Sequence, residues 1–145
     1  MKKILLSLLF LSLCFTSCES DDGITYTTPD YISGTWKFDQ IGTINNQNFV
    51  LYQNYPNSQT CESDNFVLNT NGTLEINDYT LDGTNCVNAP LAGTFTLVNK
   101  DLTFTYTENN VQVTKVYTII SLTYTEMVIV TPNSLGQSVF YKLKR

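Results

Sequence analysis

The amino-acid sequence predicts an all-β domain, and three observations carry this prediction. From Tyr31 to Arg145 the chain is dense in Thr, Val, Ile, Tyr and Phe, residues that suit a pleated, half-buried surface. No stretch there repeats apolar residues at helical spacing with caps to match. Turn-forming residues recur at short and fairly even intervals, which is typical of short antiparallel strands joined by hairpins.

Nine segments have the composition and the turn boundaries of strands, and the least regular of them lies near Phe49–Tyr52. Asn71-Gly72 suits a type I′ turn, because both residues tolerate a positive φ. Asp82-Gly83 opens a predicted loop that carries Cys86 and Pro90. The predicted strands are Gly34–Ile41, Phe49–Tyr52, Phe66–Leu68, Thr73–Ile76, Gly93–Val98, Leu102–Tyr106, Val111–Ile120, Glu126–Thr131 and Ser138–Leu143.

Along most of these strands apolar side chains alternate with Thr, Asn, Lys or Gln, so that each strand has one apolar face. A consecutive meander of such strands curls into a closed sheet, and eight strands leave room for side chains or for one small ligand. We therefore expect an up-and-down antiparallel barrel of eight or nine strands. The side chains predicted to face inward are Trp36, Phe38, Phe66, Leu68, Leu74, Ile76, Phe95, Leu97, Leu102, Phe104, Tyr106, Val139, Tyr141 and Leu143.

The N-terminus predicts export. Lys2 and Lys3 precede an apolar run, Ile4–Leu13, that is too short for a membrane span, which needs about 20 helical residues. Residues 1–17 are therefore predicted to be a cleaved signal peptide. The next residue is Cys18.

Phe15-Thr16-Ser17-Cys18 resembles the lipobox of bacterial lipoproteins, which implies that Cys18 is the lipidated first residue of the mature chain. Cleavage by an ordinary signal peptidase is the alternative. Glu19-Ser20-Asp21-Asp22-Gly23 is similar to the acidic stretch that follows the lipidated cysteine in surface-exported lipoproteins. We expect residues 18–30 to form a flexible acidic tether, residues 31–145 to form the barrel, and the lipid to anchor it to the outer membrane.

Charge and composition exclude several classes of function. Without Lys2 and Lys3 the chain carries six basic and 13 acidic residues, a net charge of about −7, which disfavours nucleic acid as a partner. The chain contains no histidine, so catalysis by Ser-His-Asp or Cys-His groups and His-ligated zinc are absent. The acids fall mainly in turns, and Asp78 with Asp82 fits no calcium-loop pattern. We expect no enzyme, no cofactor and no metal.

Two cysteines remain for the folded domain. Cys14 leaves with the signal peptide and Cys18 takes the lipid, which leaves Cys61 and Cys86 in an oxidising compartment. A disulfide between them is the expected arrangement. A metal site is the alternative, but two thiolates without histidine are a poor ligand set.

Gly34-Thr35-Trp36 at the start of the first strand resembles the Gly-x-Trp signature of lipocalins. Gly93-Thr94-Phe95-Thr96-Leu97 and Tyr141-Lys142-Leu143-Lys144-Arg145 are similar to stretches of bacterial lipocalin-like lipoprotein domains. Over residues 31–145 the resemblance implies an up-and-down barrel, either holding a small apolar molecule or filled by side chains, and it implies no reaction. It also implies that Trp36 closes one end beneath a C-terminal basic side chain, for which Arg145 is the candidate.

Two functions of different classes follow. The first is a binding module that captures a small hydrophobic or glycan-like molecule at the outer membrane. The second is a structural or protein-interaction lipoprotein, such as an accessory subunit or an enzyme inhibitor, with a filled barrel. A cavity above about 300 Å³ favours the first, and an exposed aromatic patch favours the second. The ligand-binding residues, the oligomeric state, and a periplasmic or surface-facing position are left open.

The lipobox generates a direct prediction. Cys18→Ala should release the protein from the membrane fraction, because no later apolar run is long enough to hold it there. Fractionation of cells that express the wild type and the variant measures this. A variant that still sediments with membranes would contradict the anchor.

Overall fold

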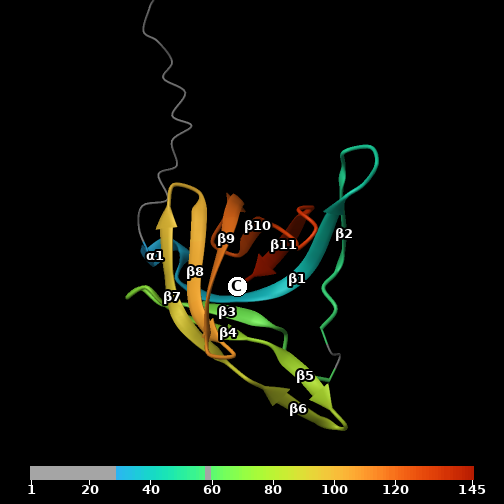
Figure 1. Ribbon diagram of the computed structural model, residues 1–145. Helices are drawn as coiled ribbons and strands as arrows, with labels where there is room; N and C mark the ends of the chain where they lie inside the picture. Colours follow the sequence, from blue (N-terminus) through green and yellow to red (C-terminus); the bar gives the residue numbers. More distant parts are fainter. Residues whose placement is uncertain (1–28, 58–59) are drawn as a thin grey trace, which may run out of the picture.

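The computed structural model describes residues 29–57 and 60–145; the predicted signal peptide and Cys18 lie outside this part of the chain. One short helix and eleven strands make up the described residues (Figure 1). Their bounds are α1 Pro29–Ile32, β1 Gly34–Ile44, β2 Val50–Asn54, β3 Asn65–Leu68, β4 Thr73–Asn77, β5 Tyr79–Asp82, β6 Asn85–Asn88, β7 Leu91–Val98, β8 Asp101–Glu108, β9 Val111–Leu122, β10 Glu126–Pro132 and β11 Ser138–Lys144.

The strands form a closed antiparallel barrel. Nine strands follow the order β11-β10-β9-β8-β7-β4-β3-β1-β2, and β11 also pairs with β1. That additional pairing closes a ring of β1, β3, β4, β7, β8, β9, β10 and β11, and leaves β2 as an extra strand. The predicted all-β meander of eight or nine strands is confirmed.

One edge of β1 is shared by two strands. Residues 34–37 of β1 pair with β3, whereas residues 40–44 pair with β2. The side chain of Asn57 bridges the gap: its Nδ2 donates to the carbonyl of Phe38 (3.3 Å), and its Oδ1 accepts from the amide of Asp64 (3.2 Å). The side chain of Asn57 therefore supplies hydrogen bonds along this edge of β1, between the part that pairs with β3 and the part that pairs with β2.

The segment predicted as a loop after Asp82-Gly83 is instead part of a hairpin. β5 and β6 pair with each other as a separate two-stranded sheet, and Figure 1 shows them projecting away from the barrel. Most of their side chains are exposed, so no alternation of apolar residues marks these strands. A disulfide between Cys61 and Cys86 ties the hairpin to the chain between β2 and β3, as expected.

The predicted type I′ turn at Asn71-Gly72 is wrong. Gly72 has a φ of 82° but Asn71 does not have a positive φ. The amide of Gly72 donates to the carbonyl of Asn69, and the amide of Asn69 donates to the carbonyl of Thr73, which describes a three-residue loop with Gly72 in the left-handed position. The turn with two positive φ values is Asn109-Asn110, at 50° and 62°.

The interior follows the predicted faces. Every side chain predicted to face inward is either buried or packed against the buried cluster. β9 and β10, for which no inward face was predicted, add Tyr117, Ile119, Met127 and Ile129. Phe104 is fully buried and lies edge-on against Phe66, with ring centroids 4.9 Å apart.

One end of the barrel is closed around Trp36, which is 0% exposed. Its Nε1 donates to the carbonyl of Ile32 (2.7 Å), which joins α1 to the core. The guanidinium of Arg145 lies 4.4 Å from the indole ring, and its Nη2 donates to the carbonyls of Tyr31 (3.2 Å) and Ser33 (2.8 Å). The C-terminal residue thus covers the indole and fastens the segment that precedes β1.

Gly34 is required at this closed end. Its φ is +142°, and a Cβ at this position would lie 2.9 Å from Nε of Arg145. A side chain here would strain the backbone and displace the guanidinium. The glycine of the Gly-x-Trp signature therefore makes room for the cation that covers the tryptophan.

Burial of the indole should matter more than the cation above it. Trp36→Ala should lower the free energy of unfolding by about 3–5 kcal/mol, because it opens a cavity in a filled core. Arg145→Ala should cost about 0.5–2 kcal/mol, since its side chain is exposed. Urea unfolding measures both. Full quenching of Trp36 fluorescence by iodide in the folded protein would refute the buried position.

Candidate ligand-binding site

A cavity of about 190 Å³ lies at the end of the barrel opposite Trp36. It is formed near the last residues of β4 and β8 and the first half of β9, whereas the closed end holds the start of β1 and the end of β11. Its lining is mainly aromatic and consists of Phe38, Tyr55, Asp64, Phe66, Ile76, Asn77, Asp78, Tyr106, Lys115, Tyr117 and Tyr141.

Packed aromatic rings form the floor of this cavity. Phe66 lies at the centre, with its ring centroid 4.8 Å from that of Phe38 and 5.9 Å from that of Tyr117. Phe104 packs beneath it and also contacts Tyr117, at 5.2 Å. Buried side chains such as Phe104 therefore lie between Trp36 and this floor, and the cavity opens on the side of the mouth.

Tyrosines line the walls. Tyr55 stacks on Phe38 with a centroid distance of 4.6 Å, and Tyr141 meets the same ring edge-on at 5.3 Å. Burial, together with the nearby carboxylate of Asp64, raises the pKa of Tyr55 well above its usual value. Burial is also the main reason that the pKa of Tyr117 is raised. Both hydroxyl groups therefore stay protonated at physiological pH.

Lys115 brings a positive charge inside the barrel. It pairs across strands with the buried Phe104, which places its side chain on the inner face of β9. Its Nζ lies 5.2 Å from the centre of the Tyr117 ring. Burial lowers the pKa of Lys115, and the carboxylate of Glu108 partly opposes this effect.

Two carboxylates lie at the same mouth. The Oδ1 of Asp64 accepts a hydrogen bond from the backbone amide of Tyr79 (2.8 Å), which fixes its side chain. Burial raises the pKa of Asp78, and the neighbouring charge of Asp64 raises it further. The cavity therefore combines aromatic walls with charges of both signs.

A row of asparagine amides supports the acidic wall. Asn88 donates to Asn77 (2.7 Å), Asn77 donates to Asn65 (3.1 Å), and Asn65 donates to the carbonyl of Ser63 (3.0 Å). Asn65 and Asn77 are buried. This row joins β6, β4 and the start of β3, and it holds the chain on either side of Asp64 and Asp78 in place.

Sequence reasoning missed the polar residues of the cavity. Lys115 falls between Val113 and Tyr117 on a strand that was predicted, so alternation along β9 could have placed it inside. Asn77 is also buried, but it lies on the outer face of β4 together with Glu75, whose Oε1 accepts from its Nδ2 (2.9 Å), so alternation of apolar residues does not indicate its burial.

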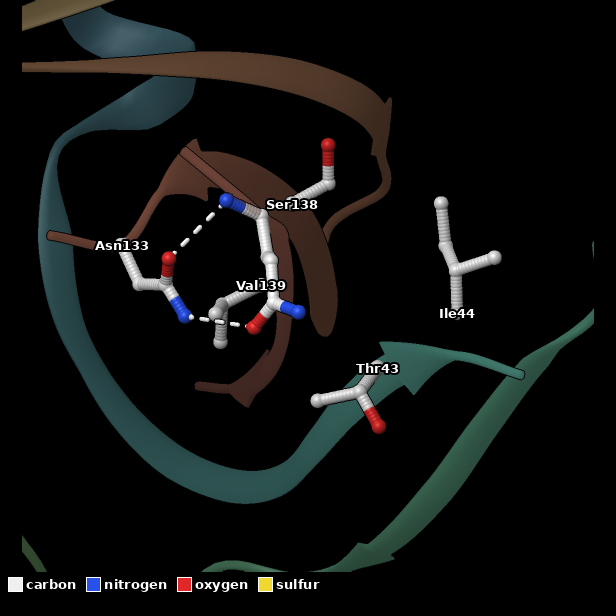
Figure 2. A pocket seen from close by; sticks show the side chains of 6 residues that line it. Thr43, Ile44, Asn133, Ser138 and Val139 are labelled. Atoms are coloured by element: carbon white, nitrogen blue, oxygen red, sulfur yellow. Dashed lines mark hydrogen bonds between the residues drawn. The ribbon is translucent and has the colours of Figure 1, made fainter. Parts of the chain in front are cut away.

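A second hollow of about 450 Å³ lies at the rim (Figure 2), between the end of β1 and the β10–β11 turn. Its lining, Thr43, Ile44, Asn133, Gln137, Ser138 and Val139, carries neither a charge nor an aromatic ring. The side chain of Asn133 is already bonded to the turn, accepting from the amides of Leu135 and Gln137 (both 2.9 Å). We therefore take the smaller, aromatic cavity as the candidate site.

The inward-facing residues Phe38, Phe66, Ile76, Tyr106 and Tyr141 predicted from the sequence line this cavity, but the site residues named from the sequence do not. Trp36 and Arg145 are together at the closed end, and Cys61 is bonded to Cys86 in the hairpin region. Cys18 lies outside the described residues. Within the described part of the chain, no group of three or more His, Cys, Asp or Glu residues could hold a metal ion, and no helix is long and apolar enough to cross a membrane.

A barrel closed at one end, with an aromatic cavity at the other, is an arrangement found among small up-and-down barrels. Residues 32–129 match the family model of the lipocalin-like domain, and the chain belongs to this family. The family resemblance expected from Gly34-Thr35-Trp36 is thereby confirmed.

Two solved bacterial structures share the fold. A lipocalin-like protein from Bacteroides uniformis is 10% identical, with a TM-score of 0.53 over 78% of this chain and 96% of that chain. An uncharacterized protein from Bacteroides eggerthii is 12% identical, with a TM-score of 0.52 over 78% of this chain and 98% of that chain. No curated protein sequence matches the chain.

The raised tyrosine pKa values predict a loss of stability in alkaline solution. In the unfolded chain Tyr55 and Tyr117 ionise near pH 10, whereas in the barrel they ionise at higher pH. Above about pH 10 the folded state therefore holds more protons, and the free energy of unfolding falls as pH rises. Urea unfolding between about pH 8 and pH 11 measures this fall. It should be shallower in the double variant Tyr55→Phe/Tyr117→Phe, and equal slopes would contradict the assignment.

Proposed function

We propose that the protein is a lipid-anchored outer-membrane binding protein that holds a small hydrophobic or glycan-like molecule in the cavity at its open end. The observation that carries this proposal is the aromatic cavity itself, with Phe38, Phe66 and Tyr141 among its walls. Membership of the lipocalin-like family supports it, because that fold typically binds small hydrophobic ligands. The proposal is one of binding without a reaction.

The size of the cavity limits the ligand. Its 190 Å³ lies below the roughly 300 Å³ of a site for a drug-sized molecule. It compares with an engineered apolar cavity of about 150 Å³ that holds benzene. A molecule of one or two rings, or a single sugar, fits this volume. Tyrosine side chains suit either, since each offers a flat face and a hydroxyl group.

The place of the N-terminus supports uptake from the aqueous side. The described part of the chain begins with α1, whose Ile32 carbonyl accepts from Trp36 at the closed end, and the proposed anchor at Cys18 precedes α1 in the sequence. The cavity lies at the other end of the barrel. An anchored barrel of this kind can therefore present its mouth away from the membrane.

A second candidate function is that of an interaction lipoprotein. The β1–β2 hairpin exposes three large apolar side chains near its tip, Ile44 at 48%, Phe49 at 66% and Leu51 at 60%. Clusters of this kind often mark protein contacts. The cavity volume of about 190 Å³ lies below the roughly 300 Å³ that would favour the binding module, and on that criterion it favours the interaction function. A binding experiment on the cavity decides between the two.

Filling the cavity should abolish binding. We expect indole or methyl β-glucoside to shift the backbone amide NMR signals of Tyr106, Lys115 and Tyr141 in the wild-type domain. Ile76→Trp puts an indole ring in place of an aliphatic side chain of the cavity lining and should weaken that binding at least about tenfold, or by about 1.4 kcal/mol.

Val116→Trp is the matched control, because Val116 is 46% exposed on the outer face of β9. It should leave binding unchanged. If neither probe binds at millimolar concentration, or if both variants weaken binding equally, the cavity is not the site. The interaction function is then the better account.

A further inference from the structure

Opposite walls of the cavity carry opposite charges. Lys115 belongs to β9, whereas Asp64 directly precedes β3. Along the barrel wall, in the order β3-β4-β7-β8-β9, β9 is the fourth strand after β3. Four strands are half of the eight-stranded ring, so β3 and β9 lie on opposite sides of the barrel. Asp78 directly follows β4, next to β3 in the ring. The basic group therefore faces the two acids across the mouth.

The ammonium group of Lys115 has an aromatic contact but no direct ion pair. The described residues form one salt bridge, between Lys144 and Asp39 (3.0 Å), and Lys115 takes no part in it. Its Nζ lies over the ring of Tyr117 at 5.2 Å. A partly buried cation without a direct ion pair is costly, because the charge of Glu108 offsets its burial only in part, and an anion brought by a ligand would offset that cost.

The acidic wall is fixed and carries surplus negative charge. Asp64 accepts a hydrogen bond from the amide of Tyr79, and the hydroxyl of Tyr55 lies near the same carboxylate, so the protein holds this side chain in place. Asp78 lies beside this charge and lines the same cavity. A cation or hydrogen-bond donor next to Asp78 would relieve the repulsion between the two carboxylates.

We infer that the cavity selects a ring-sized zwitterion, with an anionic group directed to Lys115 and an ammonium group directed to Asp78. The aromatic rings of Phe66 and Tyr141 lie among the lining residues and suit a flat body between the two charges. Because the charged walls face each other, the two ligand charges belong at opposite ends of the ring. This inference rests on the proposed function, since it names the ligand class of the same cavity.

Four probes of nearly equal shape test the inference on the mature full-length domain by calorimetry and NMR titration. The zwitterion is 4-(aminomethyl)benzoate. 4-Methylbenzoate carries only the negative charge, 4-methylbenzylamine carries only the positive charge, and p-xylene carries no charge. The zwitterion should bind at least about tenfold more tightly than either singly charged probe, the factor that one charge-assisted hydrogen bond supplies. Lys115→Met should remove the advantage over 4-methylbenzylamine, and Asp78→Asn the advantage over 4-methylbenzoate.

Matched controls are Lys37→Met and Asp82→Asn, which change exposed residues outside the cavity lining and should preserve the order of affinities. The inference is overturned if p-xylene binds as tightly as the zwitterion, although the cavity then remains a binding site as proposed. It is also overturned if the controls change the order as much as the cavity variants do. If none of the four binds while indole or methyl β-glucoside does, the charge selection alone is wrong, and if no probe of either experiment binds, both proposals fail.

Discussion

The pairing of β1 with β11 is the constraint on which the rest of the molecule depends, because it turns a nine-stranded sheet into a closed barrel. β1 is long enough to pair with β11 along one edge and with β3 and β2 along the other. The contact of Arg145 with Trp36 lies at the end of this seam. Closure thus brings the last residue of the chain onto the first strand of the core.

Closure at one end gives the barrel two unlike halves. Around Trp36 and Phe104 the interior is dry and filled, so that half supplies stability. At the other end Lys115 and Asp64 are partly buried and Asp78 is exposed, and all three line the open cavity. A filled apolar half therefore supports an open polar half, which is how binding sites are commonly arranged.

The sequence predicts the apolar part of this arrangement well and the polar part poorly. Alternation places Trp36 and Phe66 inside because each lies on a strand with a single apolar face. The same rule gives no information about Asn77, whose amide is stabilised by partners on other strands. The hairpin of β5 and β6 escapes prediction because both of its faces are exposed, and a turn such as that at Gly72 depends on a loop length that composition does not set.

Native mass spectrometry of the protein extracted from its own membrane is the most direct test of the central claim, that the open end of the barrel holds a small molecule. We predict one non-covalently bound molecule of ring size per chain, in addition to the lipid proposed at Cys18, and its release when the chain is unfolded. A spectrum that shows only the lipidated chain, under conditions gentle enough to preserve known barrel–ligand complexes, would contradict it.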